Sequence, residues 1–227
     1  DFLVRAPPPL SFLERAAMLR AFVRVTDHVR AYHTQAELLT VAQAILRRPG
    51  PVTVVEAGAG KGASTAKLSL AVRAAGGTLH VFDSFRGIPE NDERHEHLDG
   101  RPVRFRKGAF TGRLASVRRT VARFGALEVC VFHKGWFEDT LPGFDAAVDV
   151  ALLDVDLWSS TRTCLQVLYP RLAPGGIIYS QDGHLRTIVE RLANPSFWTD
   201  EVGVSPPVIP GLGTEKLLRI RPHPGAR

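Results

Sequence analysis

Short apolar runs alternate with helix-forming stretches along most of this 227-residue chain. Strand-like runs occur at residues 52–58, 78–83, 127–135, 149–156 and 177–183. Apolar residues recur at helical spacing between several of these runs, so we expect strands and helices to alternate. Such alternation predicts an α/β fold, in which a parallel sheet carries helices on both faces. Two further runs, residues 202–209 and 216–222, flank a glycine-rich turn and predict an antiparallel pair at the sheet edge.

Two capping boxes mark helices ahead of the first strand. Ser11 with Glu14, and Thr34 with Glu37, have the spacing in which a hydroxyl and a carboxylate cap one helix start reciprocally. We therefore divide the chain into an N-terminal arm and helical cap, residues 1–48, and a core, residues 49–227. Three consecutive prolines make the first ten residues an extended arm. The polar stretch 84–112 has no clear periodicity and is expected to be a mobile loop over a site.

Composition is that of a globular protein, with 44% hydrophobic and 23% charged residues. No apolar run approaches the roughly 20 residues that a membrane-spanning helix needs, so no membrane partner is expected. The chain has two cysteines, Cys130 and Cys164, both in apolar segments. This usage excludes a disulfide scaffold and favours a reducing, cytoplasmic location.

The net charge is +6 and the isoelectric point is near 9.8, which raises the question of nucleic-acid binding. The basic residues are scattered along the chain, and neither zinc-finger spacing nor an RNA-binding aromatic signature is present. We therefore expect the excess charge to be a surface property and predict no nucleic-acid partner.

The glycine-rich segment E-A-G-A-G-K-G-A-S-T, residues 56–65, lies between the first strand and the next helix. Glycines at this point allow tight turns and close approach of a ligand to the backbone. A P-loop is disfavoured because Gly62, rather than Ser or Thr, follows Lys61. A dinucleotide fingerprint is formally met, and the S-adenosylmethionine (SAM) loop E/D-x-G-x-G-x-G is matched fully by Glu56, Gly58, Gly60 and Gly62.

Asp83 ends the second strand in V-F-D-S-F. A carboxylate there can accept both ribose hydroxyls, either of a dinucleotide or of SAM. This residue therefore supports a nucleoside ligand without separating the two classes.

Acidic residues follow two further strands, and they distinguish a SAM site from a dinucleotide site. Asp154 and Asp156 end one strand on the same side, and the next strand ends in Gln181, Asp182 and His184. Carboxylates so close together need a cation or a proton, and hard oxygen ligands suit Mg²⁺, Ca²⁺ or another divalent cation. A nicotinamide dehydrogenase has no need of such a cluster.

Four segments together carry a family resemblance: VVEAGAGKGAS, VFDSFRGIP, KGWFEDTLP and DVDLWSSTRTCLQVLYPRLAPGG. Over residues 34–192 the chain resembles the macrocin O-methyltransferases, SAM-dependent enzymes that act on sugar hydroxyls of natural products and include a novobiocin relative. The resemblance implies a class I, Rossmann-like methyltransferase fold. Its sheet would have seven mostly parallel strands with an antiparallel last strand.

The resemblance also implies roles for particular residues. Asp154, Gln181 and Asp182 fall on the family's metal ligands, and Asp156 falls on its proposed general base. Close relatives have a second Asp at the position of Gln181, so a metal-free variant with His184 as base stays open. The implied cofactor-binding residues are Glu56, Gly58, Gly60, Gly62, Ser64, Asp83, Ser84, Gly135, Trp136, Phe137 and Asp154.

The sequence thus favours a SAM-dependent O-methyltransferase that acts, with Mg²⁺, on a hydroxyl of a sugar or other small natural product. Two alternatives stay open, an NAD(P)-binding oxidoreductase and a SAM-binding protein without catalysis. The identity of the acceptor is not predicted. A homo-oligomer could form through the apolar N-terminal helices. His95 and His97 are more consistent with solvated loop residues than with a zinc pair, and we expect His133 to be structural.

Overall fold

The computed structural model describes residue 2 and residues 10–222, so most of the expected arm lies outside the described residues. Two N-terminal helices, α2 (Phe12–His28) and α3 (Gln35–Leu46), precede the sheet. Both predicted capping boxes are present: Ser11 and Thr34 each accept the N–H three residues on, and Glu14 and Glu37 reach back to the cap backbone. No helix among the described residues is long and apolar enough to cross a membrane.

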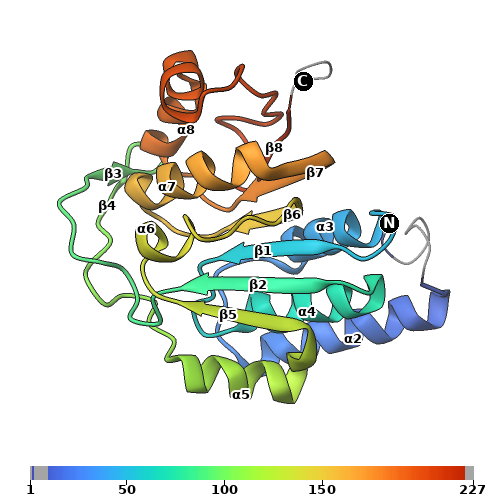
Figure 1. Ribbon diagram of the computed structural model, residues 1–227. Coiled ribbons are helices and arrows are strands. Elements are labelled where there is room, and N and C mark those ends of the chain that lie inside the picture. The colour runs from blue at the N-terminus through green and yellow to red at the C-terminus, as the bar shows by residue number, and fades with distance from the viewer. Residues whose placement is uncertain (1, 3–9, 223–227) are drawn as a thin grey trace.

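A six-stranded sheet forms the centre of the molecule, in the order β5-β2-β1-β6-β7-β8 (Figure 1). Its strands are β1 (Thr53–Ala57), β2 (Thr78–Asp83), β5 (Cys130–Lys134), β6 (Val148–Leu153), β7 (Leu172–Ser180) and β8 (Leu218–Ile220). The first five are parallel, and β8 pairs antiparallel with β7. This confirms the α/β class, the mostly parallel sheet and the antiparallel last strand.

The expected count of seven strands is wrong for the described residues. Of the run 202–209, only Val208 pairs with Arg221, as an isolated bridge. Pro206 and Pro207 precede it, and proline has no N–H to donate to a ladder. A second difference concerns β7, which begins at Leu172, five residues before the strand-like run 177–183.

Helices cover both faces of the sheet because alternate strand residues point to opposite sides. Val54 joins the hydrophobic cluster of α2, α3, α4 (Ala63–Ala75) and α5 (Leu114–Phe124), whereas Val55 joins the cluster on the other face. That second face carries α6 (Phe137–Thr140), α7 (Trp158–Leu168), α8 (Arg186–Ala193) and a π-helical segment, Phe197–Val202. The N-terminal helices therefore share one core with the sheet.

The stretch 84–112 contains a two-stranded pair, β3 (His95–Glu96) with β4 (Pro102–Val103). In Figure 1 it runs along the carboxyl ends of the parallel strands, where α/β proteins bind ligands. Short 3₁₀ turns lie at Leu127–Val129 and Tyr169–Arg171. The mobility of the loop stays a prediction.

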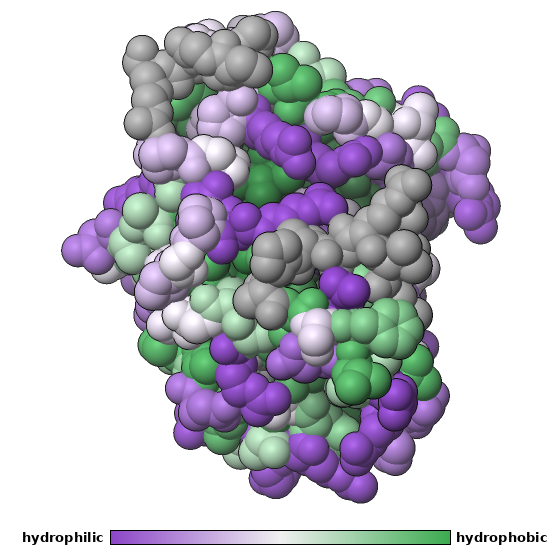
Figure 2. All heavy atoms as spheres, turned by 90° about the vertical axis from the view of Figure 1, so that its right-hand side faces the viewer, coloured by the Kyte–Doolittle hydropathy of each residue, from purple (hydrophilic) through white to green (hydrophobic). Residues whose placement is uncertain are grey.

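The opposite face, at the right-hand side of Figure 1, is shown in Figure 2. Hydrophilic and hydrophobic side chains are mixed over it, without one broad hydrophobic area. A cavity of about 1180 Å³ lies at the start of β7, and the described residues that line it include four arginines and no carboxylate. None of the residues that the sequence assigns to the site lines it.

Candidate active site

The glycine loop follows β1 and leads into α4. Gly58, Gly60 and Gly62 all have positive φ, a backbone conformation that glycine adopts readily. A Cβ at Gly58 would lie 2.1 Å from the carbonyl oxygen of Asp154, so only glycine fits there. Gly62 caps α4 without a side-chain hydrogen bond, which leaves N–H groups of the first turn for a ligand.

Asp83 fixes this loop from the end of β2. Its Oδ2 accepts the N–H groups of Ala59 (2.7 Å) and Gly60 (3.3 Å), and its Oδ1 accepts that of Phe85 (2.6 Å). Burial raises the pKa of Asp83, and these three hydrogen bonds oppose the rise. A carboxylate offers about four acceptor positions, so about one is left for a ribose hydroxyl.

Glu56 lies behind the loop and is fully buried. Both of its carboxylate oxygens lack a hydrogen bond of ordinary geometry among the described residues. Burial raises the pKa of Glu56 to about 7, while the nearby hydroxyls of Ser64 and Thr65 act to lower it. Glu56 is therefore largely protonated in slightly acidic solution.

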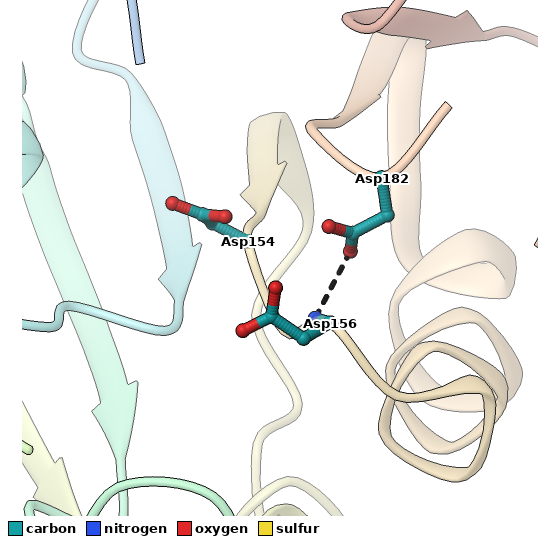
Figure 3. Close-up of side chains that lie close together, drawn as sticks. All are labelled: Asp154, Asp156 and Asp182. Atoms are coloured by element: carbon teal, nitrogen blue, oxygen red, sulfur yellow. Dashed lines mark hydrogen bonds between the residues drawn. The ribbon is translucent and has the colours of Figure 1, made fainter. Parts of the chain in front are cut away.

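The predicted acid cluster forms at the ends of β6 and β7 (Figure 3). Each of Asp154, Asp156 and Asp182 has a potential ligand oxygen within 4.8 Å of those of the other two. Oδ2 of Asp182 accepts the N–H groups of Val155 (3.3 Å) and Asp156 (3.2 Å). The other oxygen, Oδ1, is buried without a hydrogen-bond partner among the described residues.

Burial and mutual repulsion dominate the electrostatics of this cluster. Burial raises the pKa values of Asp154, Asp156 and Asp182, and repulsion between them raises those of Asp156 and Asp182 further. The positive charge of Lys216 opposes the rise at all three. Three such carboxylates can all be ionised near neutral pH only when a cation is bound beside them. Without a cation, they retain a proton between them.

Gln181 and His184 flank Asp182. Gln181 is 1% exposed, and both polar atoms of its amide lack a partner among the described residues. The Nδ1 atom of His184 lies 3.3 Å from the carbonyl oxygen of Gln181. Burial and the charge of Lys216 lower the pKa of His184, which favours the neutral imidazole and so a proton acceptor.

A cavity of about 340 Å³ connects the glycine loop to the acid cluster. Predicted residues that line it are Gly58, Gly60, Ser64, Asp83, Ser84, Gly135, Trp136, Phe137, Asp154, Asp156, Asp182 and His184. Three predicted residues, Glu56, Gly62 and Gln181, do not line it. The structure thus brings the two predicted centres into one space.

Two parts of the cavity wall were missed by the sequence interpretation. One is the linker between α2 and α3, with Arg30, Tyr32 and His33, and the other is Lys216, just before β8. An antiparallel last strand begins beside the carboxyl end of β7, and this was the signal that could have placed Lys216 near the site. Nothing in the sequence pattern marked the linker.

The histidines singled out in the sequence have separate surroundings. The expectation of a solvated side chain is wrong for His95, which is buried beside Glu93. His97 lines the cavity, with its ring 5.3 Å from that of His184. His133 stacks on Phe82 and does not line the cavity. These surroundings fit the expectation that His133 is structural.

The chain matches the family described as macrocin O-methyltransferase (TylF) over residues 30–201. It is 38% identical over 139 residues to a tetracenomycin 4′-O-methyltransferase from Streptomyces olivaceus, covering 58% of this chain and 53% of that protein. It is 36% identical over 110 residues to demethyldecarbamoylnovobiocin O-methyltransferase from Streptomyces niveus, covering 46% and 41%. The aligned part of the chain spans about half the length of these curated relatives or less.

Solved structures agree on the fold. The O-methyltransferase NovP superimposes with a TM-score of 0.64 at 20% identity, covering 92% of this chain and 98% of that one. The calicheamicin methyltransferase CalS11 superimposes with a TM-score of 0.57 at 17% identity, covering 97% of this chain and 96% of that one. At these identities the likeness shows the class I methyltransferase fold and no more.

Proposed function

The chain belongs to the macrocin O-methyltransferase family, and on that premise we propose that it transfers a methyl group from SAM to a hydroxyl of a small molecule. One observation carries the proposal: the glycine loop and the acid cluster open into the same cavity. A nicotinamide oxidoreductase would need the glycine loop but not the acid cluster.

In this proposal SAM lies along the carboxyl ends of β1, β2 and β5. The loop from Gly58 to Gly62 holds the methionine part, with Ser64, and with Glu56 fixed behind it. Asp83 and Ser84 hold the ribose, and Gly135, Trp136 and Phe137 lie beside the adenine. All but Glu56 and Gly62 line the cavity, which supports these assignments.

The residues present fit a divalent cation such as Mg²⁺. Asp182 offers a buried oxygen without a partner, and Asp154 lies close to it. Gln181 precedes Asp182 in the chain and has an unpartnered amide oxygen, but it does not line the cavity. We propose these three as the ligands, since hard oxygen donors suit Mg²⁺. When bound, the cation would lower the pKa of the acceptor hydroxyl.

The protein's own residues supply the base and the alignment. Asp156 or His184 takes the hydroxyl proton, and both line the cavity. The acceptor oxygen forms a bond to the methyl carbon while the carbon–sulfur bond breaks, leaving neutral S-adenosylhomocysteine. The cavity contributes chiefly by holding the two reactants in line.

The names of the relatives support a proposal for the acceptor class. One is named for methylating a 2,3-dimethoxyrhamnosyl tetracenomycin, and another is named mycinamicin III 3″-O-methyltransferase, from Micromonospora griseorubida. We propose a hydroxyl of a sugar or a related natural product as the acceptor here. The loop 84–112 would act as the mobile lid, and the acceptor would lie between it and the N-terminal cap.

We further propose a cytoplasmic location, based on the free thiols of Cys130 and Cys164, and self-association through α2. Phe12, Leu13 and Val23 of that helix are 56%, 74% and 50% exposed, which supports a second copy as partner. Light scattering of the purified protein at several concentrations would measure its oligomeric state.

Cofactor binding tests the function most directly. We expect S-adenosylhomocysteine and SAM to raise the melting temperature and to bind in calorimetry, and NADH to do neither. Methyl transfer is then assayed with the tetracenomycin glycoside that the first relative methylates. Binding of NADH without SAM would favour the oxidoreductase. SAM binding without transfer to any glycoside tested would favour a protein without catalysis.

The cation is tested through Asp154→Asn. We expect this variant to bind Mg²⁺ at least tenfold more weakly in calorimetry and to lose most of its turnover. Asp145→Asn, at an exposed position, is the matched control. Normal turnover of the wild type with excess EDTA would remove the cation from the mechanism and leave His184 or Asp156 to act alone.

A further inference from the structure

Helix α7 begins without a cap of its own. Its N-cap residue, Leu157, makes no side-chain hydrogen bond to the helix. Instead, the carboxylate of Glu93, in the loop 84–112, accepts hydrogen bonds from the first two backbone N–H groups of α7. Its Oε2 accepts from Trp158 at 2.8 Å and its Oε1 from Ser159 at 3.0 Å, 65 and 66 residues away along the chain. A loop carboxylate thus caps a distant helix, where a negative charge is favourable.

Glu93 is itself held in place. Nε2 of His95 lies 3.0 Å from Oε2 of Glu93, and the His95 side chain is fully buried against Phe105. Burial opposes the charge on Glu93, but the hydrogen bonds from His95, Ser159 and Trp158 outweigh it and lower its pKa to about 2. Glu93 is therefore an ionised carboxylate at every physiological pH.

The neighbouring loop residues attach to the start of α8. His97 forms an isolated bridge with Leu185, and the N–H of Leu98 donates to the carbonyl of His184 at 3.1 Å. Arg186 donates back to the carbonyl of Leu98 at 3.1 Å. We call residues 93–98 the docked segment, because they contact the first residues of both helices that follow the acid cluster.

The start of α7 determines where Asp156 lies. Four residues separate the end of β6 from the first residue of α7, and Asp156 among them has a φ of 61°. A left-handed backbone at a residue other than glycine is unfavourable and persists only where its surroundings hold it. The Asp182 carboxylate holds the N–H of Asp156 on one side, and Glu93 holds the helix start on the other.

From these contacts we infer that Glu93 is a positioning residue, which fixes the Asp154–Asp156 turn from the loop side of the cavity. The inference rests on the proposed function for its catalytic meaning. The docked segment also carries His97, which lines the cavity. Glu93 and His97 thus connect the loop 84–112 to the Asp154–Asp156 turn, so the proposed lid and the acid cluster should be held in place together.

Glu93→Ala and Glu93→Gln test this inference, with Glu90→Gln as the matched control. Glu90 is in the same loop, but its side chain is 82% exposed and pairs with Lys107 at the surface. The first readout is hydrogen exchange of the peptide that spans residues 154–160. We expect exchange there to be at least tenfold faster in Glu93→Ala, intermediate in Glu93→Gln and unchanged in Glu90→Gln.

The second readout is kinetic and uses the tetracenomycin glycoside. We expect the kcat of Glu93→Ala to fall about tenfold or more, with the KM for SAM within twofold of the wild type, and Glu93→Asp to restore part of the loss. Wild-type exchange at residues 154–160 in a folded Glu93→Ala protein would overturn the inference. So would a uniform loss of exchange protection over the whole chain. If the wild type methylates no glycoside, the proposed function fails while the exchange result still decides the role of Glu93.

Discussion

Glu56 illustrates at the scale of one residue how a buried acid beside the candidate site opposes stability. Its ordinary pKa of 4.5 rises to about 7 in the folded protein because it is buried. Below pH 4.5 the carboxyl is protonated in both states and has no effect. Between pH 4.5 and 7 the unfolded chain releases the proton more readily, so the folded state loses stability as pH rises. Above pH 7 the loss is complete, at roughly 3 kcal/mol.

The variant Glu56→Gln therefore has a pH-dependent effect on stability. We expect it to melt at a higher temperature than the wild type at pH 8 without cofactor, and the difference to shrink toward pH 5. Thermal melts over this pH range measure the difference. Glu128→Gln is the control, because that side chain is 61% exposed. A difference between Glu56→Gln and wild type that stays constant from pH 5 to 8 would contradict the expectation.

Residue types at strand ends made most of the site predictable. The acids of β6 and β7, and Asp83 of β2, could be placed together because parallel strands end at one edge of the sheet. Their hydrogen bonds could not be predicted. Asp83, expected to hold a ribose, is largely occupied by three backbone N–H groups. The left-handed conformation of Asp156 also depends on partners distant in sequence.

At the scale of elements, the starts of the two helices with capping boxes were predicted to the residue, because caps are local chemistry. The seventh strand was not, since pairing depends on backbone N–H groups that Pro206 and Pro207 lack. The position of α4 in the chain was predicted, but its nearly complete burial was not. It is buried on most sides, because α2 and α3 cover the face that the sheet leaves free.

Lys67 shows the consequence of that environment. It is fully buried in α4, and its Nζ donates to Thr26 of α2 at 2.8 Å and to Gln35 of α3 at 3.1 Å. The described contacts give it no carboxylate partner, and burial lowers its pKa from 10.5 to about 8. Below pH 8 the ammonium is charged in both states, so the folded state bears the full desolvation penalty. Stability rises between pH 8 and 10.5, where the unfolded chain still binds the proton.

Replacing Lys67 with Met removes this penalty while keeping the shape. We expect Lys67→Met to be more stable than the wild type in urea at pH 7, and this advantage to fade toward pH 10.5 by roughly 3 kcal/mol at most. Lys67→Ala leaves a cavity and is expected to be about 2–4 kcal/mol less stable than Lys67→Met. Lys107→Met, at a side chain 69% exposed, serves as the control. A Lys67→Met protein that is less stable than wild type at pH 7 would show that the hydrogen bonds outweigh the buried charge.

At the scale of the whole molecule, segments from three distant parts of the chain close the cavity. Lys216, before β8, donates to the carbonyl of Tyr32 at 2.8 Å across 184 residues of sequence. The Tyr32 ring meets the edge of Phe110 in the loop 84–112, with centroids 5.0 Å apart. Periodicity and motifs describe near neighbours, and so could not reveal this closure.

Lys216 also relates the basic chain to its acidic site. The net charge is +6, yet the cavity holds three carboxylates, and Lys216 lowers the pKa of each. Its ammonium repels a cation at that cluster while it stabilises the ionised acids.

Lys216→Met is therefore expected to change two properties, the affinity of the acid cluster for Mg²⁺ and the rate of hydrogen exchange in the linker between α2 and α3. Mg²⁺ alone should bind severalfold more tightly in calorimetry, because the repelling charge is gone. The linker residues 29–34 should exchange hydrogen severalfold faster, because the bond to Tyr32 is lost. Lys216→Arg keeps a charge and a donor, so both properties should stay near wild type. Weaker Mg²⁺ binding in Lys216→Met would mean that Lys216 supports the acid cluster by holding the linker in place, and that its charge matters less.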